Sequence, residues 1–114
     1  IKVLVLQSAD PDYFLAHADF NFAVHPETFM QLTGVGHPDT SINPMQRMTL
    51  AYRNLPQVTI AKINGIARGG GIELAMSLDM RFGSIEKTKL AQPETSLGVM
   101  PGGGATQYLP KLVG

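Results

Sequence analysis

Several absences limit what this chain can do. It contains no cysteine, which excludes disulfides and thiolate metal sites and fits a reducing compartment. Nine basic and nine acidic residues cancel, so no bulk charge draws the chain to nucleic acid or to an anionic membrane. Its longest apolar runs, such as residues 3–6, are far shorter than the ~20 residues that span a bilayer. We therefore expect neither a nucleic-acid partner nor a membrane partner.

The periodicity of the chain predicts an α/β arrangement. Its 114 residues, 44% of them hydrophobic, fit one globular unit. Three β-branched or aliphatic segments predict strands, at residues 2–7, 59–63 and 80–84. Helices are predicted from Pro44 to before Pro56, over 72–78, and over 105–109 with an interruption at Pro110. Residues 21–40 show little periodicity and predict a loop, with a helical turn near 27–32. Strands that alternate with helices indicate stacked α/β layers.

Both ends of the chain lie in apolar segments. The sequence begins inside the strand predicted at 2–7 and stops just after the apolar residues Leu112 and Val113. Such segments ordinarily pack against neighbouring elements. We therefore expect residues 1–114 to form a single partial domain.

A run of three glycines, at residues 69–71, separates a strand from an almost wholly apolar helix. Glycines at this place leave backbone N–H groups free at a helix N-terminus, where they can face an anion or a developing oxyanion. Close packing of strand and helix is the alternative reading. The helix that follows contains Glu73, and a buried carboxylate is costly unless it is paired or used. Glu73 can also be read as a first-turn acid favoured by the helix dipole, and Glu94, after Pro93, as a solvated one.

The same glycines match a second pattern. Gly65, Gly69 and Gly71 have the G-x-x-x-G-x-G spacing of short-chain dehydrogenases, which would indicate a nicotinamide site. Such an enzyme needs a tyrosine four positions before a lysine, whereas Tyr108 and Lys111 are three apart. The sequence therefore lacks the tyrosine and lysine pair that a short-chain dehydrogenase needs for catalysis, which argues against a nicotinamide site. The three histidines have no neighbours at metal-ligand spacing, so we expect no metal.

Two longer segments carry a specific resemblance. Residues 63–75, INGIARGGGIELA, resemble the crotonase signature around the oxyanion glycine and the first glutamate. Residues 91–107, AQPETSLGVMPGGGATQ, resemble the second-glutamate motif of that family and the glycine-rich turn after it. Residues 14–19 are similar to the first oxyanion segment, except that His17 stands where the family usually has glycine. The chain is identified as a member of the enoyl-CoA hydratase/isomerase (crotonase) family.

This resemblance implies a crotonase-like ββα-spiral core, truncated so that N-terminal strands and C-terminal helices of the family are missing. Ala16 and Gly70 would be the two backbone N–H donors to the thioester oxygen, and Glu73 and Glu94 the acid/base pair. Gly102 would help to seat the water. The implied substrate contacts are Ala16, His17, Ala18, Asp19, Gly70 and Gly102.

The implied reaction is hydration of a trans-2-enoyl-CoA. No cofactor is implied beyond the coenzyme A of the acyl-CoA substrate. The resemblance further implies a homo-trimer or a dimer of trimers in a bacterial cytoplasm or a mitochondrial matrix. Other reactions of the family, namely isomerisation, dehalogenation and decarboxylation, stay open, although the presence of both Glu73 and Glu94 favours hydration. A non-catalytic acyl-CoA-binding or structural subunit is the remaining alternative.

Overall fold

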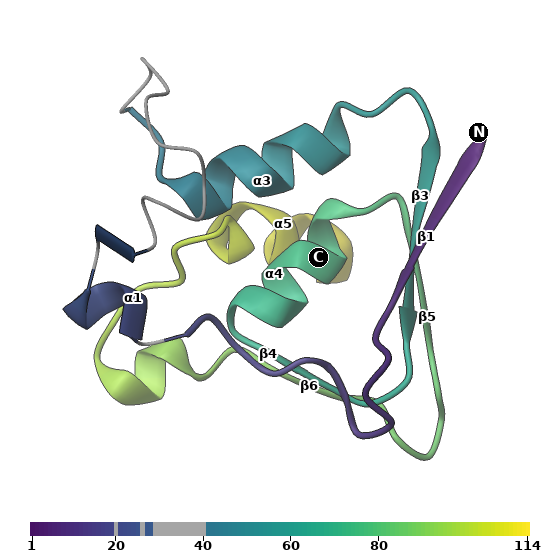
Figure 1. Cartoon of the computed structure of the whole chain (residues 1–114). Helices are drawn as coiled ribbons and strands as arrows, with labels where there is room; N and C mark the ends of the chain where they lie inside the picture. The colour runs from purple at the N-terminus through teal and green to yellow at the C-terminus, as the bar shows by residue number, and fades with distance from the viewer. Residues whose placement is uncertain (20, 26, 29–40) are drawn as a thin grey trace.

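The computed structural model describes residues 1–19, 21–25, 27–28 and 41–114, and within them the chain forms two sheets of three parallel strands each (Figure 1). The first sheet has the order β1 (Val3–Gln7), β3 (Val58–Ile63), β5 (Met80–Gly83). The second has the order β2 (Tyr13–Leu15), β4 (Ile66–Arg68), β6 (Lys89–Ala91). Consecutive strands alternate between the two sheets, so that β1, β3 and β5 are each followed by a strand of the other sheet.

Helical segments complete each pair of strands. They are α1 (Asn21–Val24), α3 (Pro44–Arg53), α4 (Gly70–Ser77), the 3₁₀ helix η1 (Pro93–Leu97) and α5 (Ala105–Val113). The order strand, strand, helix recurs along the chain, which confirms the expected α/β ββα-spiral fold. Within the described residues, no helix is long and apolar enough to cross a membrane.

Helix α4 occupies the centre of the molecule. It contacts α3, α5, β2 and β4, and it is drawn between the two sheets in Figure 1. Its apolar residues join the core, where Ala75 is fully buried and Met76 is 3% exposed. A Cβ built on Gly71 would lie 2.0 Å from the carbonyl oxygen of Leu15, so only glycine allows the first turn of α4 to approach the end of β2 this closely. This approach brings the end of the second strand to the N-terminus of the central helix.

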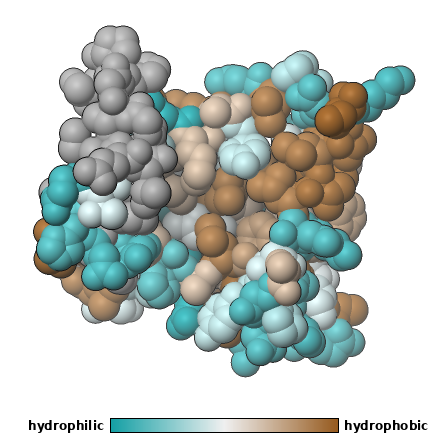
Figure 2. Space-filling model, viewed as in Figure 1, coloured by the Kyte–Doolittle hydropathy of each residue, from teal (hydrophilic) through white to brown (hydrophobic). Residues whose placement is uncertain are grey.

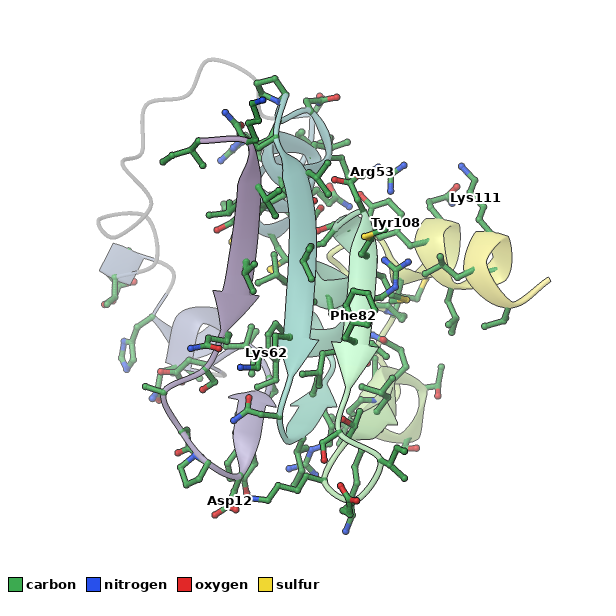
Figure 3. All side chains as sticks on the ribbon, turned by 90° about the vertical axis from the view of Figure 1, so that its right-hand side faces the viewer. Asp12, Arg53, Lys62, Phe82, Tyr108 and Lys111 are labelled. Atoms are coloured by element: carbon green, nitrogen blue, oxygen red, sulfur yellow. The ribbon has the colours of Figure 1, made fainter. Side chains whose placement is uncertain are left out.

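One face of the first sheet is apolar and exposed. Figure 3 shows it turned towards the viewer, with Lys62 and Phe82 labelled, and Figure 2 shows apolar atoms gathered where these strands lie. Its exposed apolar side chains are 44–61% accessible, and they are Val3, Val5, Val58, Met80 and Phe82. We call these five residues the outer sheet face.

The structure corrects several expectations. Strands β2, β4 and β6 were not predicted, because each has only three residues, too few to show a period of two. A short helix, Asn21–Val24, begins where a loop was predicted, and the turn expected near 27–32 lies mostly outside the described residues. The predicted interruption at Pro110 is wrong, because α5 continues to Val113. Proline removes a single hydrogen bond there, and its own carbonyl still accepts one from the amide of Gly114 at 3.0 Å.

Candidate active site

The N-terminus of α4 is shaped by glycine. Gly69 precedes the helix with φ of 52°, a left-handed value that favours glycine, and its N–H donates to the Ala91 carbonyl of β6 at 3.0 Å. Gly70 is the first helical residue and is buried. Its N–H has no acceptor among the described residues, as is usual for the first amides of a helix. A donor at the positive end of the helix dipole is thus available to an anion.

The segment after β2 lies against this N-terminus. A Cβ built on Gly70 would lie 3.5 Å from the backbone nitrogen of Ala18. Ala16 is half-buried, and its N–H also lacks an acceptor among the described residues. The structure therefore brings the two predicted oxyanion segments side by side, each with an available amide.

The other predicted contacts on this segment have local partners. The Nδ1 atom of His17 donates to the carbonyl of Ala18 at 2.6 Å, and its side chain is exposed. The Oδ1 atom of Asp19 accepts a hydrogen bond from the N–H of Asn21 at 2.9 Å, at the start of α1. His17 and Asp19 therefore hold the local path of the backbone next to Gly70.

Glu73 is buried inside the protein, with 2% of its surface exposed. Its Oε1 atom accepts hydrogen bonds from the N–H groups of Gly103, at 2.8 Å, and Ala105, at 3.0 Å. The carboxylate thus lies at the N-terminus of α5, and not over the free amides of its own helix, as a first-turn acid would. Its second oxygen, Oε2, has no hydrogen-bond partner within the described residues. One oxygen anchors the side chain while the other stays available for chemistry.

Glu94 approaches the N-terminus of α4 from η1. A Cβ built on Gly69 would lie 2.7 Å from its Oε1 atom, so the carboxylate packs directly against the glycine that precedes Gly70. Its Oε2 atom accepts a hydrogen bond from Nε2 of Gln92 at 2.9 Å. Sequence reasoning did not single out Gln92, although its place two residues before Glu94 was a usable signal. Glu94, on η1, thus lies against the residue that precedes α4, and Glu73 is in the first turn of that helix.

The glycine turn before α5 completes the arrangement. Gly103 donates its N–H to Glu73, and Gly102, the residue predicted to help seat the water, precedes it in the same turn. The N–H of Gly102 has no acceptor in the described part of the chain. Met45 of α3 lies between the two glycine turns, since its side chain would be 3.1 Å from a Cβ on Gly70 and 2.8 Å from one on Gly103.

The glycines also bear on the dinucleotide reading. A Cβ on Gly65 would lie 2.1 Å from the carbonyl oxygen of Asp12, so this residue serves the close packing of two backbone segments. It lies between β3 and β4 and is no part of a helix N-terminus. Among the described residues, no group of three or more histidine or acidic side chains is placed to hold a metal ion. The polar groups that the structure gathers here are backbone amides, which donate, and two carboxylates, which accept.

Comparison with known proteins identifies the family. The family model for enoyl-CoA hydratase/isomerase matches residues 1–114. This chain belongs to the enoyl-CoA hydratase/isomerase family. It is 40% identical over 115 residues to the fatty acid oxidation complex subunit alpha of Aliivibrio fischeri, covering 100% of this chain and 16% of that protein.

Solved structures agree with the family assignment. A candidate enoyl-CoA hydratase from Streptomyces avermitilis superposes with a TM-score of 0.89 at 40% identity, covering 100% of this chain and 41% of that one. Another, from Thermobifida fusca in complex with acetoacetyl-CoA, superposes with a TM-score of 0.74 at 26% identity, covering 100% of this chain and 46% of that one. The chain thus spans less than half the length of these relatives, and it contains the segments with both glutamates and both glycine turns.

Proposed function

We propose that the protein to which this chain belongs hydrates trans-2-enoyl-CoA thioesters to 3-hydroxyacyl-CoA. The observation that supports this most is the position of the two carboxylates. Glu94 packs against Gly69, and Glu73 lies in the first turn of α4, the helix that begins at Gly70, whose N–H has no acceptor among the described residues. Two carboxylates beside an available amide are the groups that addition of water to an enoyl thioester requires.

The thioester oxygen binds between the amides of Ala16 and Gly70. When the water oxygen bonds to the β-carbon, the electron pair of the double bond moves towards the carbonyl, and its oxygen gains charge. Two aimed N–H groups then lower the barrier by several kcal/mol in an enclosed site, the order of effect found for oxyanion holes. The dipole of α4 adds to this effect, because Gly70 is its first residue.

The two glutamates divide the proton transfers. Glu73 orients and deprotonates the water through Oε2, the oxygen that the turn before α5 leaves unbonded. Glu94 supplies the proton to the α-carbon, so that water is added across the double bond without change of charge. Gly102, whose N–H has no acceptor among the described residues, helps to hold the water. Coenzyme A enters as part of the substrate, in keeping with the acetoacetyl-CoA bound by the Thermobifida structure, and the full-length protein assembles as trimers.

The test is a pair of substitutions in the full-length protein. Glu73→Gln and Glu94→Gln should each lower kcat for a short enoyl-CoA by about 10²–10⁴-fold with little change in KM, because glutamine cannot exchange a proton. Glutamine at position 73 still accepts the bonds from Gly103 and Ala105, so the fold should persist. The matched control is Glu86→Gln, an exposed glutamate between β5 and β6, which should leave kcat unchanged.

The outcomes separate the rival functions. The double substitution should cost less than the product of the single effects, because both groups act in one step. Activity that survives Glu94→Gln but not Glu73→Gln would indicate a family member with a single base. If neither substitution matters, the anchoring of Glu73 at α5 is purely structural, and the protein is a binding or structural relative.

A further inference from the structure

The turn before α5 is held by α3 as well as by Glu73. The carbonyl of Gly102 accepts a hydrogen bond from Nδ2 of Asn43 at 2.8 Å. The carbonyl of Gly103 accepts one from the hydroxyl of Thr49 at 3.1 Å. Asn43 caps the N-terminus of α3 and Thr49 lies within that helix, so one helix holds both carbonyls of the turn.

The same turn sets the position of Glu73. The Gly102 carbonyl and the Gly103 N–H belong to one peptide group, which accepts from Asn43 at one end and donates to Glu73 at the other. Rotation of this group would break both bonds together. Hydrogen bonds in series also polarise one another. The bond from Asn43 to the Gly102 carbonyl therefore makes the Gly103 N–H a stronger donor to Glu73.

Thr49 is completely buried, with 0% of its surface exposed. A threonine inside a helix often bonds only to a carbonyl one turn back, and its hydroxyl does lie 3.0 Å from the Gln46 carbonyl. The single hydroxyl hydrogen is shared between that carbonyl and the carbonyl of Gly103, which belongs to a different element. Tyr108 of α5 donates its hydroxyl to Thr49 at 3.4 Å, and the centre of its ring lies 4.9 Å from the guanidinium carbon of Arg53. Figure 3 labels Tyr108 and Arg53 close to one another. Tyr108 of α5 therefore contacts two residues of α3, next to the turn that precedes α5.

We propose that Asn43 and Thr49 are positioning residues for the reaction: by holding the Gly102–Gly103 turn they fix Oε1 of Glu73 and so aim Oε2 at the substrate water. The inference rests on the proposed function for its kinetic consequence. Neither side chain touches the substrate in this scheme, since both act through the backbone of the turn. The turn thus transmits the position of α3 to the catalytic carboxylate.

The substitutions isolate the two bonds in the full-length protein. Thr49→Val removes the hydroxyl with little change of shape, whereas Thr49→Ser keeps the hydroxyl and removes only the methyl group. Asn43→Ser keeps a good N-cap while removing the amide donor. We expect Thr49→Val and Asn43→Ser each to lower kcat about tenfold with KM within about twofold, and Thr49→Ser to retain the wild-type kcat. The matched control is Thr59→Val, a buried threonine whose hydroxyl bonds to Asp79 at the other end of α4, and it should leave kcat unchanged.

Two further measurements distinguish positioning from general destabilisation. In the Glu73→Gln background, Thr49→Val should have little further effect on kcat, because its effect passes through Glu73. Amide exchange at Gly103 and Ala105 should be about tenfold faster in Thr49→Val than in Thr59→Val. Full additivity with Glu73→Gln, or equal exchange in the two variants, would overturn the proposal. If the wild-type protein hydrates no enoyl-CoA, the proposed function fails, while the exchange experiment still decides whether Thr49 holds the turn.

Discussion

Replacing Gly103 with alanine tests the packing of the site by adding one methyl group. The added Cβ would lie 2.5 Å from Oε2 and 2.9 Å from Cδ of Glu73, and 2.8 Å from Cγ of Met45. Ordinary contacts are longer, so both side chains must move. Gly102→Ala is the matched neighbour, because its Cβ would meet only Nδ2 of Asn43, at an ordinary 3.7 Å. Neither glycine has a positive φ, so backbone strain does not separate the two variants.

The expected cost of Gly103→Ala follows from these contacts. Overpacking a filled site costs about 1–3 kcal/mol. Moving Glu73 also weakens its bonds to Gly103 and Ala105, each a bond to a charged group that contributes about 1.5–3 kcal/mol. Because the side chain can relax in part, we expect a total loss of about 2–4 kcal/mol for Gly103→Ala. Gly102→Ala should stay within about 0.5 kcal/mol of wild type.

The assay is denaturant unfolding of the two full-length variants beside wild type. A shift of the midpoint at constant slope reports the loss of stability directly. Equal stability of the two variants would refute the placement of Glu73 against Gly103, and with it the argument that this turn anchors the carboxylate.

Two other predictions concern regions away from the site. The pKa of Asp79 is lowered from 3.8, first by the N–H and then by the hydroxyl of Thr59, so its stabilising effect is present at neutral pH and is lost as the pH falls through the lowered pKa. In Asp79→Asn, the free energy of unfolding should therefore fall less steeply as the pH is lowered below about 4. The same pH dependence in the variant and the wild type would contradict this. The outer sheet face should make the isolated 114-residue chain self-associate in sedimentation, and Phe82→Lys should reduce association more than Met100→Lys, an exposed change off that face. An equal reduction of association by the two substitutions would argue against the outer sheet face as the surface that self-associates.

The sequence allowed much of the fold and the main site to be predicted. Strands long enough to show a pattern, such as β1 and β3, were predicted within one residue, because a run of β-branched and aliphatic residues is visible in five or six positions. The short strands were missed, because three residues carry no period. β2 and β6 are extended because each pairs with β4, a strand far away in the sequence, and such pairing cannot be seen in a local pattern.

The site shows the same division. The glycine turn at 69–71 and a buried Glu73 were predicted from the residues themselves, because glycines and a carboxylate are unusual next to an apolar helix, whereas the pairing of Glu73 with Glu94 was implied only by the resemblance to the crotonase family. The anchoring of Glu73 by Gly103 was not predicted, and neither were the bonds from Asn43 and Thr49 to the turn. These contacts join residues 30 to 59 positions apart, and backbone amides carry no signal in a sequence. A helix-capping asparagine and a helical threonine have adequate local explanations until the fold is known.

The conformation of Gly104 explains why α5 depends on a distant glutamate. Helices are usually capped by the side chain of the residue just before them, but Gly104 in that position has φ of 116°, which other residues rarely adopt. A Cβ there would also lie 2.6 Å from the Tyr108 ring. A local serine or asparagine cap is thus sterically excluded, and the free amides need an acceptor from another element. Glu73 supplies it from α4 with one oxygen, so the bonds that stabilise α5 also satisfy a buried carboxylate and orient its second oxygen. If Glu73 acts as proposed, stability and reactivity depend on the same two amides, and a change at Gly103 should affect both.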